Sequence, residues 1–387
     1  MIKSRNGMFA CLAIGVLGLI GTFAAIGQDA PRAMHSYLVA FVFWLALAWG
    51  SLGWVLAFNT GRSRWVVLIR RAIEVNASTI PVFALLSVPI FMNLPSLYSW
   101  ADNPLAGSGD PHLLRFRAVY LGQNFVLARA VLYFALTGAL GTALYRWSRL
   151  QDARPGELIY TVRQRFWSAA GLPPLALIIA FAGIDWVMSL QPGWISTMFG
   201  FYMIAGAVVG AMGLFAIQSA WLQTTNRLPG KLPRRGQHNL GLLLFAFTIF
   251  WAYVAFAQFL LIWMGDMPEE LSWMLARTVG AWQPVAYFLL IGHFCIPFAL
   301  LLPVTIKVRP LALAWVGAWV MLCCYVDVYW LIMPHLDAAP HPTWMDLTAF
   351  LGVGGIAGAT WFWQASLGAA APVGDQYIDD SMQPSHG

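Results

Sequence analysis

The chain has 387 residues, of which 60% are hydrophobic and 10% are charged, and it contains 20 tryptophans. A soluble globular domain carries about 25% charged residues, so this composition excludes that class. The apolar residues come in blocks of about 20, each long enough to cross the hydrocarbon core as a helix. We therefore expect an all-α polytopic membrane protein in contact with lipid, and the net charge of +6 indicates topology rather than binding to nucleic acid.

Ten membrane-spanning helices are predicted. The first is expected to be retained, because the residues from Phe23 to Gly27 make a poor signal-peptide cleavage site. The predicted spans cover residues 8–27, 37–58, 78–98, 124–145, 171–190, 198–222, 240–263, 281–305, 311–333 and 344–367.

The basic residues test this count. With the N-terminus inside, 17 of the 22 lysines and arginines, Lys3 among them, fall in cytoplasmic segments. Four fall in outer segments, namely Arg32, Arg115, Arg117 and Arg277. Cytoplasmic segments carry an excess of positive charge, so we predict that both termini are cytoplasmic.

Three segments between or after the spans have a predicted structure. Residues 62–76 suggest a helix lying in the membrane plane, with a basic loop as the alternative. Residues 264–280 suggest a short surface helix with Glu269 and Glu270 in its first turn. The polar, acidic tail at 368–387 is expected to be cytoplasmic and disordered.

No redox centre is expected in this chain. The cysteines lie inside apolar blocks and form no CxxC pattern, which argues against an iron–sulfur cluster, a covalently attached haem or a disulfide framework. His293 is the histidine predicted at membrane depth, so haem held by two histidines is not expected. We predict no metal ligands and no catalytic residues.

Two carboxylates lie inside apolar helices in the same local pattern. Asp185 and Asp327 are each followed seven residues later by a proline, Pro192 or Pro334, and are 142 residues apart. A carboxylate in hydrocarbon is expensive and is by default a functional-site candidate. Helices 2–5 (about 37–190) and helices 6–9 (about 198–333) would therefore form two four-helix bundles within one membrane domain, 1–367, with helices 1 and 10 peripheral.

Further polar side chains are predicted near these carboxylates. Arg129, Asp185, Gln258 and Asp327 each lie about five or six residues from the outer end of a span, roughly 8 Å deep. Arg129 is the natural partner of Asp185, and this pair could be purely structural. Asp327 has no evident basic partner, which suits proton exchange; its candidate neighbours are Gln258, His293, Tyr253 and Tyr325.

Four stretches then carry a family resemblance. They are HNLGLLLFAFTIFWAYVAFAQFLLIWMGDMPEE (238–270), IDWVMSLQPGWISTMFG (184–200), GHFCIPF (292–298) and DVYWLIMP (327–334). Together they resemble the ActF family of integral subunits of alternative complex III, the bacterial quinol:cytochrome c oxidoreductase, within the NrfD/PsrC-like membrane proteins. Two positions depart from the family pattern: Gly193 stands where histidine is usual, and Asn239 stands where aspartate is usual.

The resemblance implies a cofactor-free subunit of the bacterial inner membrane that contacts the quinone pool and conducts protons. It also implies partners: a sister NrfD-like subunit that binds quinol, an iron–sulfur subunit, multi-haem and mono-haem cytochrome c subunits, small membrane subunits and, as a further candidate, a terminal oxidase. The hypothetical proton path comprises Asp327, Asp185, Arg129, His293, Tyr253, Gln258 and Tyr325. The alternatives are a stand-alone secondary transporter with parallel repeats and a purely structural anchor subunit.

Overall fold

A computed structural model describes residues 5–102 and 119–382. The described residues contain ten helices long and apolar enough to cross a membrane, which confirms the all-α fold class and the predicted number of spans. The spans are Arg5–Ile26, Ala30–Thr60, Val67–Met92, Gln123–Ala153, Leu158–Leu190, Phe199–Thr224, Arg234–Gly265, Gly280–Leu301, Pro310–His335 and Trp344–Ser366. Lys3, Arg115 and Arg117, which are predicted to lie in segments outside the membrane, are not among the described residues.

Six spans are single long helices, and the others are built from shorter pieces. The long helices are α1 (Arg5–Ile26), α2 (Ala30–Thr60), α9 (Gln123–Ala153), α11 (Phe199–Thr224), α12 (Arg234–Gly265) and α18 (Trp344–Ser366). The third span is composed of α3 (Val67–Ser78), α4 (Ile80–Leu86) and α5 (Val88–Met92), and the fifth of α10 (Leu158–Trp186) and η1 (Met188–Leu190). The eighth span is composed of η2 (Gly280–Trp282), α14 (Gln283–Phe288), the π-helix η3 (Leu289–Cys295) and α15 (Ile296–Leu301). The ninth is composed of α17 (Pro310–Ile332) and η4 (Met333–His335). The connecting segments hold α6 (Leu94–Leu97), α7 (Ser99–Asp102), α13 (Pro268–Thr278) and α16 (Val304–Lys307), and α19 (Ile378–Met382) follows the last span.

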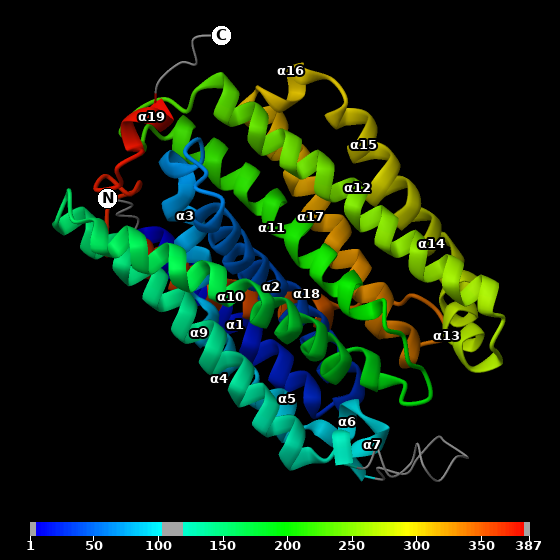
Figure 1. Cartoon of the computed structure of the whole chain (residues 1–387). Helices are drawn as coiled ribbons and strands as arrows, with labels where there is room; N and C mark the ends of the chain where they lie inside the picture. Colours follow the sequence, from blue (N-terminus) through cyan, green and yellow to red (C-terminus); the bar gives the residue numbers. More distant parts are fainter. Residues whose placement is uncertain (1–4, 103–118, 383–387) are drawn as a thin grey trace.

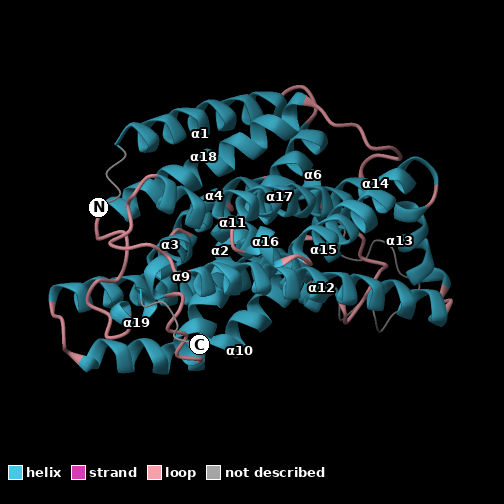
Figure 2. Ribbon diagram, turned by 90° about the horizontal axis from the view of Figure 1, so that it is seen from above, coloured by secondary structure: helices cyan, strands magenta, loops and turns pink. Residues whose placement is uncertain are grey.

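The helices form two bundles and a peripheral pair, as the sequence predicts. α2, α3–α5, α9 and α10 pack together, and α11, α12, α14–α15 and α17 form the second group. α1 and α18 pack tightly on each other and on α2, along one edge of the molecule (Figure 2). Both chain ends lie at the same end of the helices, opposite α7 and α13 (Figure 1). The cytoplasmic assignment of that end stays a prediction.

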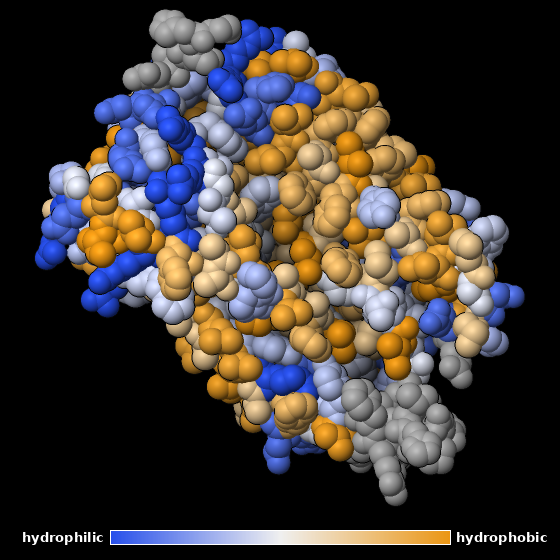
Figure 3. Space-filling view, in the orientation of Figure 1, coloured by the Kyte–Doolittle hydropathy of each residue, from blue (hydrophilic) through white to orange (hydrophobic). Residues whose placement is uncertain are grey.

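Apolar side chains cover the middle of the molecule. Figure 3 shows a broad hydrophobic surface there, with hydrophilic residues gathered mainly near the chain termini. Large side chains such as Leu177, Phe256 and Trp315 are 59%, 61% and 77% exposed. Such a surface is stable only against an apolar medium or partner, as expected for a membrane-spanning chain.

Proline divides the third span. Pro81 and Pro89 stand in the first turns of α4 and α5, where the missing N–H group interrupts the helical ladder. The hydroxyls of Thr79 and Ser87 donate to main-chain carbonyls three residues earlier. Each hydroxyl thereby satisfies its own donor on the main chain of the preceding turn, where no water is available in the membrane.

The prediction of an in-plane helix at 62–76 is wrong. α3 is buried along its whole length and begins the third span. Its arginines have buried carboxylate partners instead of lipid headgroups: Arg70 contacts Glu74 at 2.9 Å and Asp375 at 2.6 Å, and Arg71 contacts Glu74 at 3.3 Å. The alternating basic and apolar residues therefore reflect a buried ion-pair cluster.

The prediction of disorder after residue 367 is wrong for residues 368–382. This segment packs on the N-terminal part of α3 and the C-terminal end of α9, where Asp375 is buried against Arg70 and Asp380 contacts Arg64 at 3.1 Å. Its acidic composition, which indicated a solvated tail, instead matches the arginines of the first bundle. The short surface helix predicted within 264–280 is confirmed as α13.

α2 and α11 join the two bundles at a very close crossing. A Cβ atom added to Gly50 would lie 2.0 Å from the carbonyl oxygen of Ala207. α1 and α18 meet in the same way, with Gly15 against Gly355. Small residues let membrane helices approach backbone to backbone, so these glycines fix the relative positions of the helices.

We expect Gly50→Ala to weaken the α2–α11 crossing, because the added methyl group overlaps main chain that cannot move independently. Overpacking costs about 1–3 kcal/mol, so the thermal midpoint in detergent should fall. Gly206→Ala, on α11 with no heavy atom within 4 Å of the added Cβ, is the matched control and should be neutral or slightly stabilising. Equal midpoints for the two variants would contradict this account of the crossing.

Candidate functional site: a buried carboxylate beside a membrane cavity

Asp327 is held by two neutral donors. It lies on α17 with 3% of its surface exposed. The Tyr202 hydroxyl on α11 donates to its Oδ1 at 2.5 Å, and the Trp251 indole on α12 donates to its Oδ2 at 3.2 Å. No ion pair in the described part of the chain includes Asp327. That it lacks a cation in the assembled protein stays a prediction, and its two donors were not predicted from the sequence.

His293 belongs to the same cluster through Trp251. The two rings lie 3.8 Å apart between centroids, and His293 Nε2 lies 3.6 Å from Cys324 Sγ. The Nδ1 atom is buried and has no hydrogen-bond partner in the described part of the chain. His293 thus lies behind the indole that binds Asp327.

The helix around His293 has π-helical geometry. In η3 the N–H group of Ile296 donates to the carbonyl of Ile291, five residues back. The Trp319 indole donates to the carbonyl of Gly292 at 2.7 Å. Pro297, which lacks an N–H group, follows this turn and accounts for the interrupted ladder. π-helical turns are frequent at functional sites.

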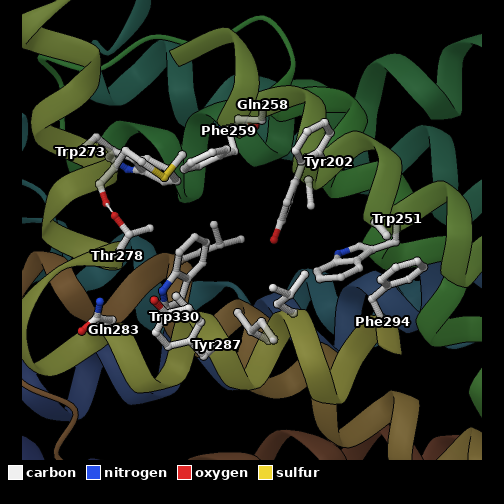
Figure 4. A pocket seen from close by; sticks show the side chains of 18 residues that line it. Tyr202, Trp251, Gln258, Phe259, Trp273, Thr278, Gln283, Tyr287, Phe294 and Trp330 are labelled. Carbon is white, nitrogen blue, oxygen red and sulfur yellow. Dashed lines mark hydrogen bonds between the residues drawn. The ribbon is translucent and has the colours of Figure 1, made fainter. Parts of the chain in front are cut away.

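A cavity of about 600 Å³ lies beside this cluster. Its walls come from α11, α12, α13, α14, η3 and α17. Figure 4 shows Trp251 and Phe294 on one side of the space, Trp273 and Thr278 on the other, and the Tyr202 side chain reaching into it. Tyr202 and Trp251 therefore both bind Asp327 and form the cavity wall. Pockets of 300–1,000 Å³ lined by apolar groups and a few polar ones are typical small-molecule sites.

Gln258 supplies an unsatisfied acceptor at the wall. The residue is 4% exposed, and its Oε1 atom has no hydrogen-bond partner among the described residues. It follows Trp251 by seven residues, so both lie on the same face of α12. A buried amide oxygen without a donor costs about 1–3 kcal/mol, a cost that a bound donor would remove.

Arg277 connects two elements of the cavity wall, α13 and α17. Its guanidinium donates to the carbonyls of Trp273 and Leu331 at 3.1 and 2.9 Å and lies 4.0 Å from the Trp273 ring centroid. The Trp330 indole donates to the Arg277 carbonyl at 3.0 Å. Burial lowers the pKa of Arg277 from its ordinary value to about 9. The residue ties together α13 and α17, which both line the cavity.

In the first bundle, the predicted contact between Arg129 and Asp185 is confirmed. Arg129 Nε donates to Asp185 Oδ2 at 2.9 Å, and Arg129 Nη2 donates to Asp185 Oδ1 at 2.8 Å. The Tyr133 hydroxyl adds a third bond to Oδ2 at 2.9 Å. Asp185 is 1% exposed and fully engaged by this bidentate pair. Its geometry matches the structural interpretation of the pair.

The two membrane carboxylates lie at similar levels. Asp185 comes five residues before the end of its span and Asp327 eight residues before the end of its own, a difference of about 4.5 Å along a helix. α11 connects them: Met203 contacts the position of Gly183, one half-turn from Asp185, while its neighbour Tyr202 binds Asp327. These contacts concern the two carboxylates alone, and a shared polar layer that includes Gln258 stays a prediction.

Two predicted site residues do not join the cluster. The Tyr253 side chain is 66% exposed on the outer face of α12. Tyr325 packs its ring against Phe43 and Phe350, toward the first bundle and α18. Tyr202 and Trp251 take the place expected for these tyrosines. The seven-residue spacing of Trp251 and Gln258 was the available signal, but with 20 tryptophans in the chain it did not stand out.

The sequence matches no known family model and no curated protein. Within residues 5–102 and 119–382, no three His, Cys, Asp or Glu side chains gather as metal ligands would. The function is therefore inferred from the Asp327 cluster and the cavity.

We expect removal of one partner of the Arg129–Asp185 pair to destabilise the fold. Breaking a buried pair typically costs about 3–5 kcal/mol, because the remaining charge is left uncompensated. Arg129→Met and Asp185→Leu should each lower the free energy of unfolding in detergent, whereas the double variant should lose clearly less than the sum. Additive losses would show that the two side chains are not energetically coupled.

Proposed function

We propose that this chain is a membrane subunit of a respiratory quinol:cytochrome c oxidoreductase, in which it contacts the quinone pool and conducts protons. The observation that carries the proposal is Asp327, a buried membrane carboxylate held by neutral donors at the wall of a cavity. Ionisable groups inside a membrane characteristically mark ion or proton pathways.

Asp327 is suited to a proton relay because changing its protonation state breaks no ion pair. The Tyr202 hydroxyl forms part of the cavity wall and bonds directly to Oδ1. A proton arriving in the cavity can pass to Asp327 through this hydroxyl, which gives up one proton to the carboxylate as it accepts another. The Trp251 indole keeps the second oxygen oriented throughout.

The other residues of the hypothetical path have different roles in this proposal. His293 and Gln258 flank the Asp327 cluster, through Trp251 and the cavity wall respectively. The Arg129–Asp185 pair holds the first bundle together at a similar level. Tyr253 and Tyr325 are left out of the path, because neither contacts the cluster.

The proposal includes an assembly in the bacterial inner membrane. The chain would itself carry no redox centre. A sister quinol-binding subunit, an iron–sulfur subunit and cytochrome c subunits would hold the electron carriers, and the termini would face the cytoplasm. The exposed apolar surface leaves room for such membrane partners as well as for lipid.

A stand-alone transporter is disfavoured by the junction of the bundles. Rocking of two repeats requires them to slide past each other, but α2 and α11 meet backbone to backbone at Gly50 and Ala207. Mild purification followed by an absorption spectrum separates the two classes. Co-purifying haem c supports the respiratory subunit, and a colourless single polypeptide supports the transporter.

We expect Asp327→Asn to block proton conduction in the intact complex. The amide keeps the size of the side chain but cannot accept and release a proton at neutral pH. Loss of a positioned proton-transfer group typically lowers the rate by about 10²-fold or more. Proton release per quinol oxidised, measured in proteoliposomes, should fall, and Asp327→Glu should restore part of it.

Asp266→Asn is the matched control for this experiment, since Asp266 is an exposed carboxylate at the end of α12. It should leave proton release unchanged. If Asp327→Asn also leaves proton release per quinol unchanged, Asp327 has no part in the mechanism.

A further inference from the structure

The cavity beside Asp327 opens toward the membrane. Three of its lining side chains, Phe256, Tyr287 and Leu290, are also 61%, 56% and 56% exposed on the apolar surface of the second bundle. The opposite wall is deep, because Trp251 and Trp273 are each 4% exposed. A ligand can therefore enter from the lipid phase with its polar part inward and an apolar tail left between the helices and the lipid.

The inner part of the cavity is shaped by flat aromatic surfaces. Trp251 and Phe294 stand on one side and Trp273 on the other, with Tyr287 and Trp330 across from Gln258 (Figure 4). Aromatic side chains bind planar rings through stacked and edge-to-face contacts. A branched or purely aliphatic ligand would not use these surfaces as well as a flat ring would.

Two polar atoms of the cavity wall near Asp327 can accept a hydrogen bond from a ligand. Gln258 Oε1 is buried without a partner and can only accept a hydrogen bond. The Tyr202 hydroxyl gives its proton to Asp327, so toward the cavity its oxygen also presents a lone pair. An acyl chain of a phospholipid has no donor for either acceptor, whereas a ring that carries hydroxyl groups does.

We infer that this cavity is a binding site for the hydroxylated ring of an isoprenoid quinol. The ring would lie between Trp251 and Trp273, with one hydroxyl group donating to Gln258 Oε1 and the apolar tail leaving past Tyr287. This inference rests on the proposed function and deepens it: the second bundle of this chain would bind quinol directly, in addition to any site in a sister subunit.

The test measures binding of decyl-naphthoquinol and decyl-benzoquinol to the purified full-length chain in lipid nanodiscs. A photoreactive quinone analogue, cross-linked and mapped by mass spectrometry, locates the site. We expect labels on α12, α13 and α14. Gln258→Leu removes the acceptor without changing the size of the wall much, and it should weaken quinol binding about tenfold.

Ala286→Trp gives a second variant that fills the cavity without touching the polar groups. Ala286 lines the cavity on α14, and the indole should abolish both binding and labelling. Ala169→Trp, at an exposed position of α10 in the other bundle, is its matched control and should bind quinol normally. Thermal midpoints of all variants establish that the chain is folded.

Three results would overturn the inference. They are no measurable quinol binding to the folded chain, binding that survives both Gln258→Leu and Ala286→Trp, and a co-purified phospholipid in the cavity that neither quinol displaces. These outcomes are separable from the Asp327→Asn experiment. Proton conduction can fail with quinol binding intact, and binding can be absent while Asp327 still conducts protons.

Discussion

A charged side chain buried in hydrocarbon has to be compensated, and this requirement organises the whole molecule. Three buried carboxylates in the described spans, Glu74, Asp185 and Asp346, each pair with an arginine. The Glu74 pair lies within α3, the Asp185 pair joins α9 to α10, and the Asp346 pair joins α2 to α18. Asp327 departs from this rule, since its hydrogen-bond donors among the described residues are a phenol and an indole.

The two bundles therefore differ in how their membrane carboxylate is bound. In the first bundle, the carboxylate is saturated by a bidentate arginine and a tyrosine, so a change in its charge would break three bonds. In the second bundle, a cavity occupies the space beside the carboxylate. The two bundles thus share their order of helices and the position of a carboxylate. They differ in that the carboxylate of the first bundle is held by an arginine and a tyrosine, whereas the carboxylate of the second lies beside a cavity that could hold a ligand.

The sequence was informative where a strong physical cost governs a position. Hydrophobic length fixed the ten spans, and the absence of cationic neighbours singled out Asp327. The sequence led to wrong predictions where two distant segments neutralise each other's charge. The segment of Arg70 was predicted to lie on the membrane surface, and the segment of its partner Asp375, 305 residues away, was predicted to be disordered. The donors Tyr202 and Trp251 lie 125 and 76 residues from Asp327 and belong to other helices, so only the packing of α11 and α12 on α17 brings them together.

Trp251 links binding in the cavity to the state of the carboxylate. Its ring lies 3.8 Å from the His293 ring between centroids, the side chain lines the cavity, and its N–H group donates to Asp327. A ring stacked in the cavity would press on the same indole that orients the carboxylate. His293, in the π-helical turn η3, contacts that indole on the other side. A displacement of the indole away from the cavity would therefore require η3 to move as well. Contact in the cavity would therefore be transmitted to Asp327 through a single rigid side chain, without any rearrangement of the bundles.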